Sequence, residues 1–163
     1  MKLFPFQKYS IVIKKGSLNA LTELRKQTVS SEHYVSNWDN QSFIGIINTT
    51  DFEIALSRKL YGCFCVLKCK LENQNGILEI TIHKTYKLIF IAFTLFAILG
   101  FLISLLNNGF ENSSQLLFQT LLFVIVLRFV IIELGFRIIF KKGLHKLIEI
   151  IGIETIKKLD KNS

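Results

Sequence analysis

The sequence predicts an α+β protein in which a small antiparallel β-sheet domain, with one or two covering helices, precedes a two-helix transmembrane hairpin. Three observations carry this prediction. Residues 88–106 form a long run without a charged side chain, and residues 116–140 form a second apolar run. The first half of the chain instead alternates apolar and polar residues with the period of two that is typical of β-strands.

The composition is apolar and basic at once. Half of the 163 residues are hydrophobic, the mean hydropathy is +0.42, and 20 Lys and Arg stand against 12 Asp and Glu. A soluble domain of this size buries too little surface to hide so many apolar side chains. The combination indicates a membrane protein with basic parts in the cytosol. Nucleic acid is not an expected partner, because the basic residues are scattered and form no stripe or arm.

The first predicted transmembrane helix covers residues 88–106, LIFIAFTLFAILGFLISLL. Only Thr94 and Ser104 are polar in this run, and none of its 19 residues is charged. At the rise of an α-helix it spans roughly 30 Å, the thickness of the hydrocarbon core of a bilayer. It has no polar face, whereas a helix at the surface of a globular protein has one.

The second predicted transmembrane helix covers about residues 116–138 and belongs to the apolar run that ends at residue 140. The nine residues 107–115 between the two runs are polar and have Asn108 and Gly109 near their centre, which predicts a short loop. A connection this short makes the two helices antiparallel neighbours. Residues 88–140 are therefore expected to form one transmembrane hairpin.

The flanking charges predict the orientation of this hairpin. Lys and Arg are retained on the cytosolic side of a membrane, and the connecting loop has neither, with Glu111 as its one charged residue. We therefore expect a multi-pass protein of the inner, cytoplasmic membrane with both termini in the cytosol. The basic residues on which this expectation depends are Lys84, Lys87, Lys141, Lys142 and Lys146.

Three charged residues of the second helix, Arg128, Glu133 and Arg137, are the candidate intramembrane polar contacts. Glu133 and Arg137 are four apart, so they share a helical face and are expected to pair. Arg128 and Glu133 are five apart, which in an α-helix turns them away from each other. Arg128 is then expected to face the other helix or a partner subunit. A transport or proton-relay role is less favoured, because two helices alone enclose no pathway.

Residues 1–87 are predicted to form a cytosolic β-α-β-β-β-β domain. The expected turns are Asn48 to Asp51 and Asn75-Gly76, both of which are typical of β-hairpins. On the longest strand, Cys63, Cys65 and Cys69 share one face. The expected strands are residues 9–14, 43–47, 52–57, 61–71 and 78–82, with a helix over residues 18–28.

Residues 141–163 are predicted to form a cytosolic amphipathic helix and tail. This helix can pack on the sheet or lie in the membrane interface. Packing on the sheet is favoured, because a sheet of this size needs a cover for its apolar face. The residues that approximate its apolar face are Leu144, Leu147, Ile148, Ile151, Ile156 and Leu159.

The run Phe43-x-Gly45-x-Ile47, followed after four residues by Phe52-x-Ile54, resembles an uncharacterised family of small bacterial two-helix integral membrane proteins with a β-rich N-terminal cytosolic domain. The resemblance covers roughly residues 40–105. Residues 61–72 look like the family's next strand, although this chain has cysteines where Pro and Gly are more typical. The resemblance implies a fold but no activity. The element order is also similar to a truncated START-like helix-grip fold, which binds apolar ligands.

No pattern in the chain predicts a catalytic site, a metal or a cofactor. The serine-nucleophile, phosphate-loop and dinucleotide motifs are all missing from the sequence. Cys63 and Cys69 lie about 20 Å apart on a regular strand, so one zinc ion cannot hold all three cysteines. Trp38, Phe43 and Phe52 are a candidate pocket, although such aromatic residues more often anchor a loop to the core.

The sequence leaves three classes of function. The first is a membrane-anchored binding or scaffolding module, whose partner is a protein, a second copy of the chain or an apolar small ligand. The second is an accessory subunit that docks into a larger membrane complex through its transmembrane helices. The third, an enzyme or a small transporter, is least favoured because no polar constellation supports it.

Overall fold

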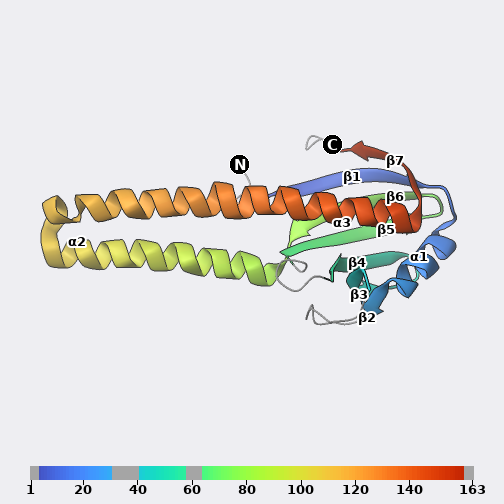
Figure 1. The fold of residues 1–163 in the computed structure, drawn as a ribbon, viewed down its shortest axis with the longest axis horizontal. Coiled ribbons are helices and arrows are strands. Elements are labelled where there is room, and N and C mark those ends of the chain that lie inside the picture. Colours follow the sequence, from blue (N-terminus) through green and yellow to red (C-terminus); the bar gives the residue numbers. More distant parts are fainter. Residues whose placement is uncertain (1–3, 31–40, 58–63, 160–163) are drawn as a thin grey trace.

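The computed structural model describes residues 4–30, 41–57 and 64–159, which form an α+β fold. A seven-stranded mixed sheet carries helices on one face, and a long helical hairpin extends away from one end of this sheet domain (Figure 1). The strands are β1 (Phe6–Ile13), β2 (Thr28–Ser30), β3 (Phe43–Ile47), β4 (Asp51–Leu56), β5 (Cys65–Glu72), β6 (Asn75–Ile82) and β7 (Ile153–Lys158). The helices are α1 (Ser17–Lys26), α2 (Lys84–Val126), the π-helix η2 (Leu127–Leu134) and α3 (Gly135–Ile151).

The strand order in the sheet is β2-β3-β4-β5-β6-β1-β7. All neighbours are antiparallel except β2 and β3, which are parallel. The sequence predicts β1 and β3 to β6 together with the helix between the first two predicted strands, and the structure confirms these elements. The two edge strands, β2 and β7, were not predicted.

The core lies between the sheet and the helices α1 and α3, which contact each other on the same face. Alternate residues of the strands point into it, as the period of two requires. From α3, Phe136 and Leu147 pack fully buried against this face. Gly143 brings α3 close to the sheet, because a Cβ there would lie 3.4 Å from the side chain of Leu67 and 3.5 Å from that of Leu56. The C-terminal helix therefore packs on the sheet.

The predicted C-terminal helix is too long, because α3 ends at Ile151. Gly152 adopts the left-handed conformation, with φ 65° and ψ 54°, and its N–H donates to the Ile148 carbonyl at 3.0 Å. Such a glycine is a common helix stop. The chain then turns back as β7 and pairs with β1, so Ile156 lies opposite Ile11 in the sheet and not on a helix.

The first predicted β-turn is confirmed and the second is misplaced. Asn48 closes the β3–β4 hairpin, with its side-chain amide 2.8 Å from the Asp51 carboxylate. The β5–β6 hairpin turns at Asn73, whose φ is 58°, whereas Asn75 and Gly76 already belong to β6. A Cβ at Gly76 would lie 2.6 Å from Leu71 Cδ2, so a larger residue there would displace the end of that side chain.

The hairpin consists of two arms that lie side by side (Figure 1). Helix α2 is interrupted at Gly109, whose φ of 74° and ψ of 172° reverse the chain. The turn is therefore tighter than the expected loop of residues 107–115. Among the described residues, one helical stretch, Lys84–Asn107, is long and apolar enough to cross a membrane, and only 6% of its most apolar part is buried.

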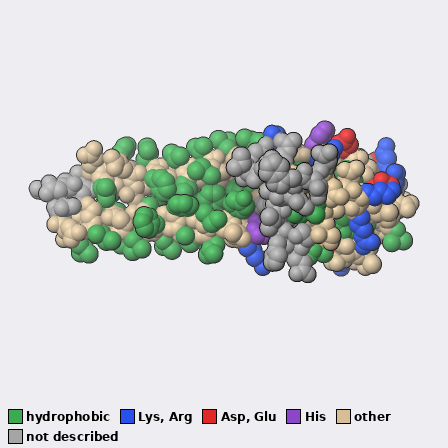
Figure 2. Space-filling view, turned by 60° about the horizontal axis from the view of Figure 1, so that its bottom comes forward, with side chains coloured by type: hydrophobic (Ala, Val, Ile, Leu, Met, Phe, Trp, Pro, Cys, Tyr) green, Lys and Arg blue, Asp and Glu red, His purple; other side chains and the backbone are tan. Residues whose placement is uncertain are grey.

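The second arm is continuous with the helix that covers the sheet. It leaves the hairpin through η2 and enters α3 without a break. Hydrophobic side chains gather over the hairpin, whereas charged side chains gather at the sheet end (Figure 2). One helical rod thus joins an apolar surface to the core of the sheet domain.

Candidate ligand pocket at the base of the helical hairpin

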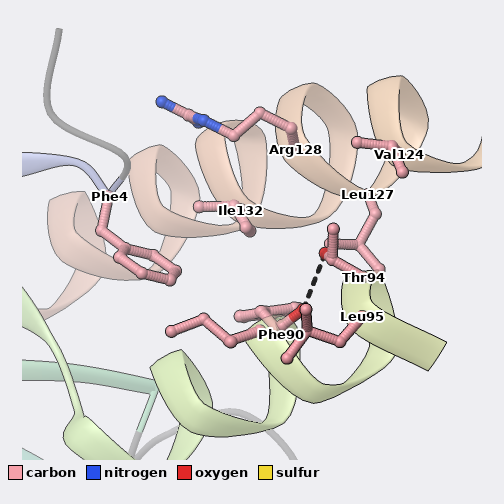
Figure 3. Close-up of a pocket in the computed structure, with 9 residues that line it drawn as sticks. Phe4, Phe90, Thr94, Leu95, Val124, Leu127, Arg128 and Ile132 are labelled. Atoms are coloured by element: carbon pink, nitrogen blue, oxygen red, sulfur yellow. Dashed lines mark hydrogen bonds between the residues drawn. The ribbon is translucent and has the colours of Figure 1, made fainter. Parts of the chain in front are cut away.

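An apolar pocket of about 220 Å³ lies where the two arms meet the sheet domain (Figure 3). Phe4 closes the end nearest the sheet, and the arms supply the walls. Thr94 contributes a hydroxyl to the described lining, and this hydroxyl donates to the Phe90 carbonyl at 2.8 Å. The lining residues are Phe4, Phe90, Ile91, Thr94, Leu95, Val124, Leu127, Arg128 and Ile132.

Arg128 lies at the rim of this pocket and belongs to a charged triad. Its Nη1 is 3.3 Å from Glu133 Oε2, and Arg137 Nη2 is 3.2 Å from Glu133 Oε1. The pairing of Glu133 with Arg137 was predicted. The expectation that Arg128 turns away from Glu133 was wrong, because Leu127–Leu134 is π-helical and brings residues five apart onto one face.

The triad carries one uncompensated positive charge, because two guanidinium groups share one carboxylate. Arg128 is the more enclosed of the two, with 19% of its side chain exposed against 62% for Arg137. Figure 3 shows its side chain running along the second arm, on the side away from Phe90 and Leu95. Positive charge is thus available at the mouth of an apolar site.

Lys87 adds a second cation near the pocket. Its Nζ lies 5.9 Å from the centre of the Phe4 ring, within the range of a cation–π contact. It precedes Ile91 by four residues on the first arm, so the two residues share a helical face.

His83 caps the start of α2, where its side chain accepts the Thr85 N–H at 3.4 Å. Burial lowers the pKa of His83, which favours the neutral imidazole that can accept this bond.

A second apolar hollow of about 390 Å³ lies farther along the hairpin. It shares Val124 with the first pocket, and both hollows are lined by residues from both arms. On the first arm, Phe90, Thr94, Ile98 and Phe101 repeat every three or four residues and therefore form one helical face. The two hollows follow the same seam between the arms.

Of the candidate pocket residues Trp38, Phe43 and Phe52, the structure describes Phe43 and Phe52. The side chains of Phe43 and Phe52 are 0% and 1% exposed and belong to the core cluster. They stabilise the packing of the sheet, and the structure brings neither to the pocket between the arms. Trp38 lies outside the described residues. No sequence pattern marked Phe4, which reaches the pocket through the fold of β1.

Cys65 and Cys69 are buried under the helices, and Cys63 lies outside the described residues. The Cys65 thiol lies 3.9 Å from the Phe136 carbonyl. Burial raises the pKa of Cys69 to about 12 and that of Cys65 further still. Within the described ranges, no group of three or more His, Cys, Asp or Glu residues is placed to hold a metal ion.

The outer face of the sheet carries a ladder of charges. Lys68 Nζ is 2.6 Å from Glu53 Oε2, and Lys8 Nζ is 3.1 Å from Glu79 Oε1. Glu53, Lys68, Glu79 and Lys8 lie opposite one another on four neighbouring strands. Each pair is about 40% exposed and stabilises the fold little. The ladder marks this face as one in contact with water.

No protein-family model, no curated protein and no solved structure matches the chain.

Proposed function

We propose that the protein is a membrane-anchored binding module whose helical hairpin inserts into the bilayer and whose sheet domain lies at the cytosolic surface. The observation that carries this proposal is the exposure of the first arm. Its apolar side chains project into the surroundings, and they would be unstable there in water. A bilayer is the solvent that suits such a surface.

The second arm supports the same arrangement. Between Leu116 and Leu127 it has no charged residue, and most of its large apolar side chains are exposed. Arg128, the next charged residue after Glu111, follows Gly109 by 19 residues, or about 28 Å of helix. This length matches a hydrocarbon core of about 30 Å. The triad then lies at the headgroup level, where charged side chains are tolerated.

The charges around the hairpin favour a cytosolic sheet domain. Lys84 and Lys87 begin the first arm, and Arg137, Lys141 and Lys142 follow the second arm. The sequence of the turn, by contrast, has no Lys or Arg. Positive flanks of this kind are retained in the cytosol, which supports a two-pass protein of the inner membrane with both termini inside.

A binding role is supported by the pocket at the base of the hairpin. It is apolar, has walls from both arms and has cations at its mouth. Pockets with a few polar groups around an apolar lining are typical of small-ligand sites. The second arm continues into α3, which packs on the sheet. A ligand bound between the arms would therefore contact the same continuous helix that covers the sheet core.

The alternative is an accessory subunit that docks into a larger membrane complex through its transmembrane helices, with Arg128 and Glu133 as the contact residues. In the structure this guanidinium is already paired with Glu133. The exposed apolar faces of the hairpin also suit contact with another membrane protein, and it is the pocket at the base of the hairpin that favours the binding module.

Extraction of isolated membranes with alkaline carbonate tests the proposed anchoring. The treatment removes peripheral proteins and leaves membrane-spanning ones in the pellet. We expect the chain to stay in the pellet and to float with lipid in a density gradient after detergent removal. Release into the alkaline supernatant would overturn the proposal.

A further inference from the structure

The seam between the arms has the length of a lipid tail. From Leu117, in the outer hollow, to Arg128, at the rim of the inner one, the helix rises about 16 Å. One leaflet of a bilayer contributes about 15 Å of hydrocarbon. If the hairpin is inserted as proposed above, the two hollows follow the leaflet that faces the sheet domain.

The cations lie at the depth of the phosphate groups of that leaflet. Arg128 is about 28 Å from the turn along the second arm, and Lys87, 22 residues before Gly109, is about 33 Å from it along the first. Arg128 is among the lining residues of the inner hollow, and Lys87 contacts the ring of Phe4, which closes that hollow. An anion held there would have its apolar part directed along the seam.

The charge of the site favours a ligand with net negative charge. The triad has two arginines for one glutamate, and Lys87 contacts a ring and not a carboxylate in the described structure. A zwitterionic lipid brings its own cation and would gain less from these groups. Guanidinium groups also suit phosphate oxygens, which they can contact through two parallel hydrogen bonds.

We propose that this seam is a binding site for one anionic phospholipid, with its phosphate between Arg128 and Lys87 and one acyl chain along the two hollows. The proposal rests on the insertion of the hairpin proposed above. It assigns the pocket to a membrane lipid and not to a soluble metabolite, because a free phosphate compound would leave the apolar hollows empty.

Native mass spectrometry tests the proposal on the full chain released from nanodiscs that contain equal amounts of phosphatidylglycerol and phosphatidylcholine with the same acyl chains. We expect one retained lipid, with phosphatidylglycerol favoured about fivefold. The Arg128→Leu variant should lose this preference, whereas Arg137→Leu, which removes the same charge from the exposed side of the triad, should keep it. Thr94→Phe, which fills the pocket, should reduce retention of both lipids.

Three results would overturn the lipid site. One is equal retention of the two lipids by the parent chain. Another is an equal effect of Arg128→Leu and Arg137→Leu, which would indicate attraction by surface charge alone. The third is displacement of the lipid by inorganic phosphate. If the chain enters nanodiscs but shows no preference between the two lipids, only the lipid site is refuted. If the chain fails to enter nanodiscs, the proposed membrane anchoring is refuted as well.

Discussion

Arg128 and Glu133 form an ion pair across five residues of a single helix, with Nη1 and Oε2 3.3 Å apart. In a regular α-helix, residues five apart are separated by about 140° around the axis. The pair forms because Leu127–Leu134 is π-helical. Short π-helical segments often occur at functional sites, and this one lies where the exposed arm becomes the helix that covers the sheet.

Loss of the Glu133 carboxylate is predicted to destabilise the protein more than loss of its exposed partner Arg137. Glu133→Gln leaves Arg128, which is mostly enclosed, without its carboxylate partner. We expect the free energy of unfolding to fall by about 1–2 kcal/mol. Arg137→Gln removes only an exposed partner and should cost less than about 1 kcal/mol. Thermal unfolding in detergent, followed by circular dichroism, measures both, and equal losses would contradict the geometry of the triad.

The π-helical segment is predicted to tolerate the loss of one residue. A π-bulge behaves as one extra residue in an α-helix, so deletion of the exposed Val130 should give a regular helix with both flanking faces kept. Arg128 and Glu133 then become four apart and stay paired. We expect a thermal midpoint no lower than that of the parent chain, and the same penalty for Glu133→Gln in this background. Collapse of the fold on deletion would show that the π-geometry itself is required.

Gly45 is predicted to be intolerant of any side chain. Its φ is +149°, and a Cβ there would lie 2.1 Å from the Glu53 carbonyl oxygen on the neighbouring strand. Gly45→Ala should therefore destabilise the sheet domain by about 2–4 kcal/mol through strain and overpacking. Gly16→Ala is the matched control, because a Cβ at Gly16 meets nothing within 4 Å. Similar midpoints for the two variants in chemical unfolding would refute this account of the Phe43-x-Gly45-x-Ile47 run.

Two exposed leucines are predicted to respond differently to the same change. Leu99 lies in the first arm with 55% of its side chain exposed, and Leu18 lies on α1 with 72% exposed. Leu99→Lys should cost about 3 kcal/mol of membrane insertion, because lysine is unfavourable in the middle of a membrane helix. Leu18→Lys should leave insertion unchanged. The fraction of each variant that resists carbonate extraction measures this, and equal fractions would argue against a lipid-facing first arm.

Much of the fold could be predicted from the sequence because its signals are local. Alternation along residues 65–71 and 78–82 placed one apolar face of β5 and β6, and the uncharged run of residues 88–106 predicted the first arm. The edge strand β7 was missed because the apolar positions after Gly152 also fit a helix. Gly152 itself was the available signal, since a glycine after the last apolar turn commonly ends a helix.

The site was less predictable because it depends on contacts between distant segments. Arg128 and Glu133 were recognised from the sequence as ionisable residues in an apolar helix. Their pairing depends on a π-helix, which no local sequence pattern predicted. Phe4 reaches the pocket only through the pairing of β1 in the sheet. The sequence alone could not assign Phe43 and Phe52 to the core or to a pocket, because a large aromatic residue fits both equally well.

The measurement that tests the central claim most directly is the accessibility of the two ends of the hairpin in intact spheroplasts. Single cysteines at Asn107→Cys, beside the turn, and at Lys26→Cys, on α1, are placed in a Cys63→Ser background. The remaining Cys65 and Cys69 are buried with raised pKa values and should not react. A membrane-impermeant maleimide should label Asn107→Cys at once and Lys26→Cys only after the membrane is permeabilised. Labelling of both positions, or of neither, before permeabilisation would contradict a hairpin that crosses the membrane.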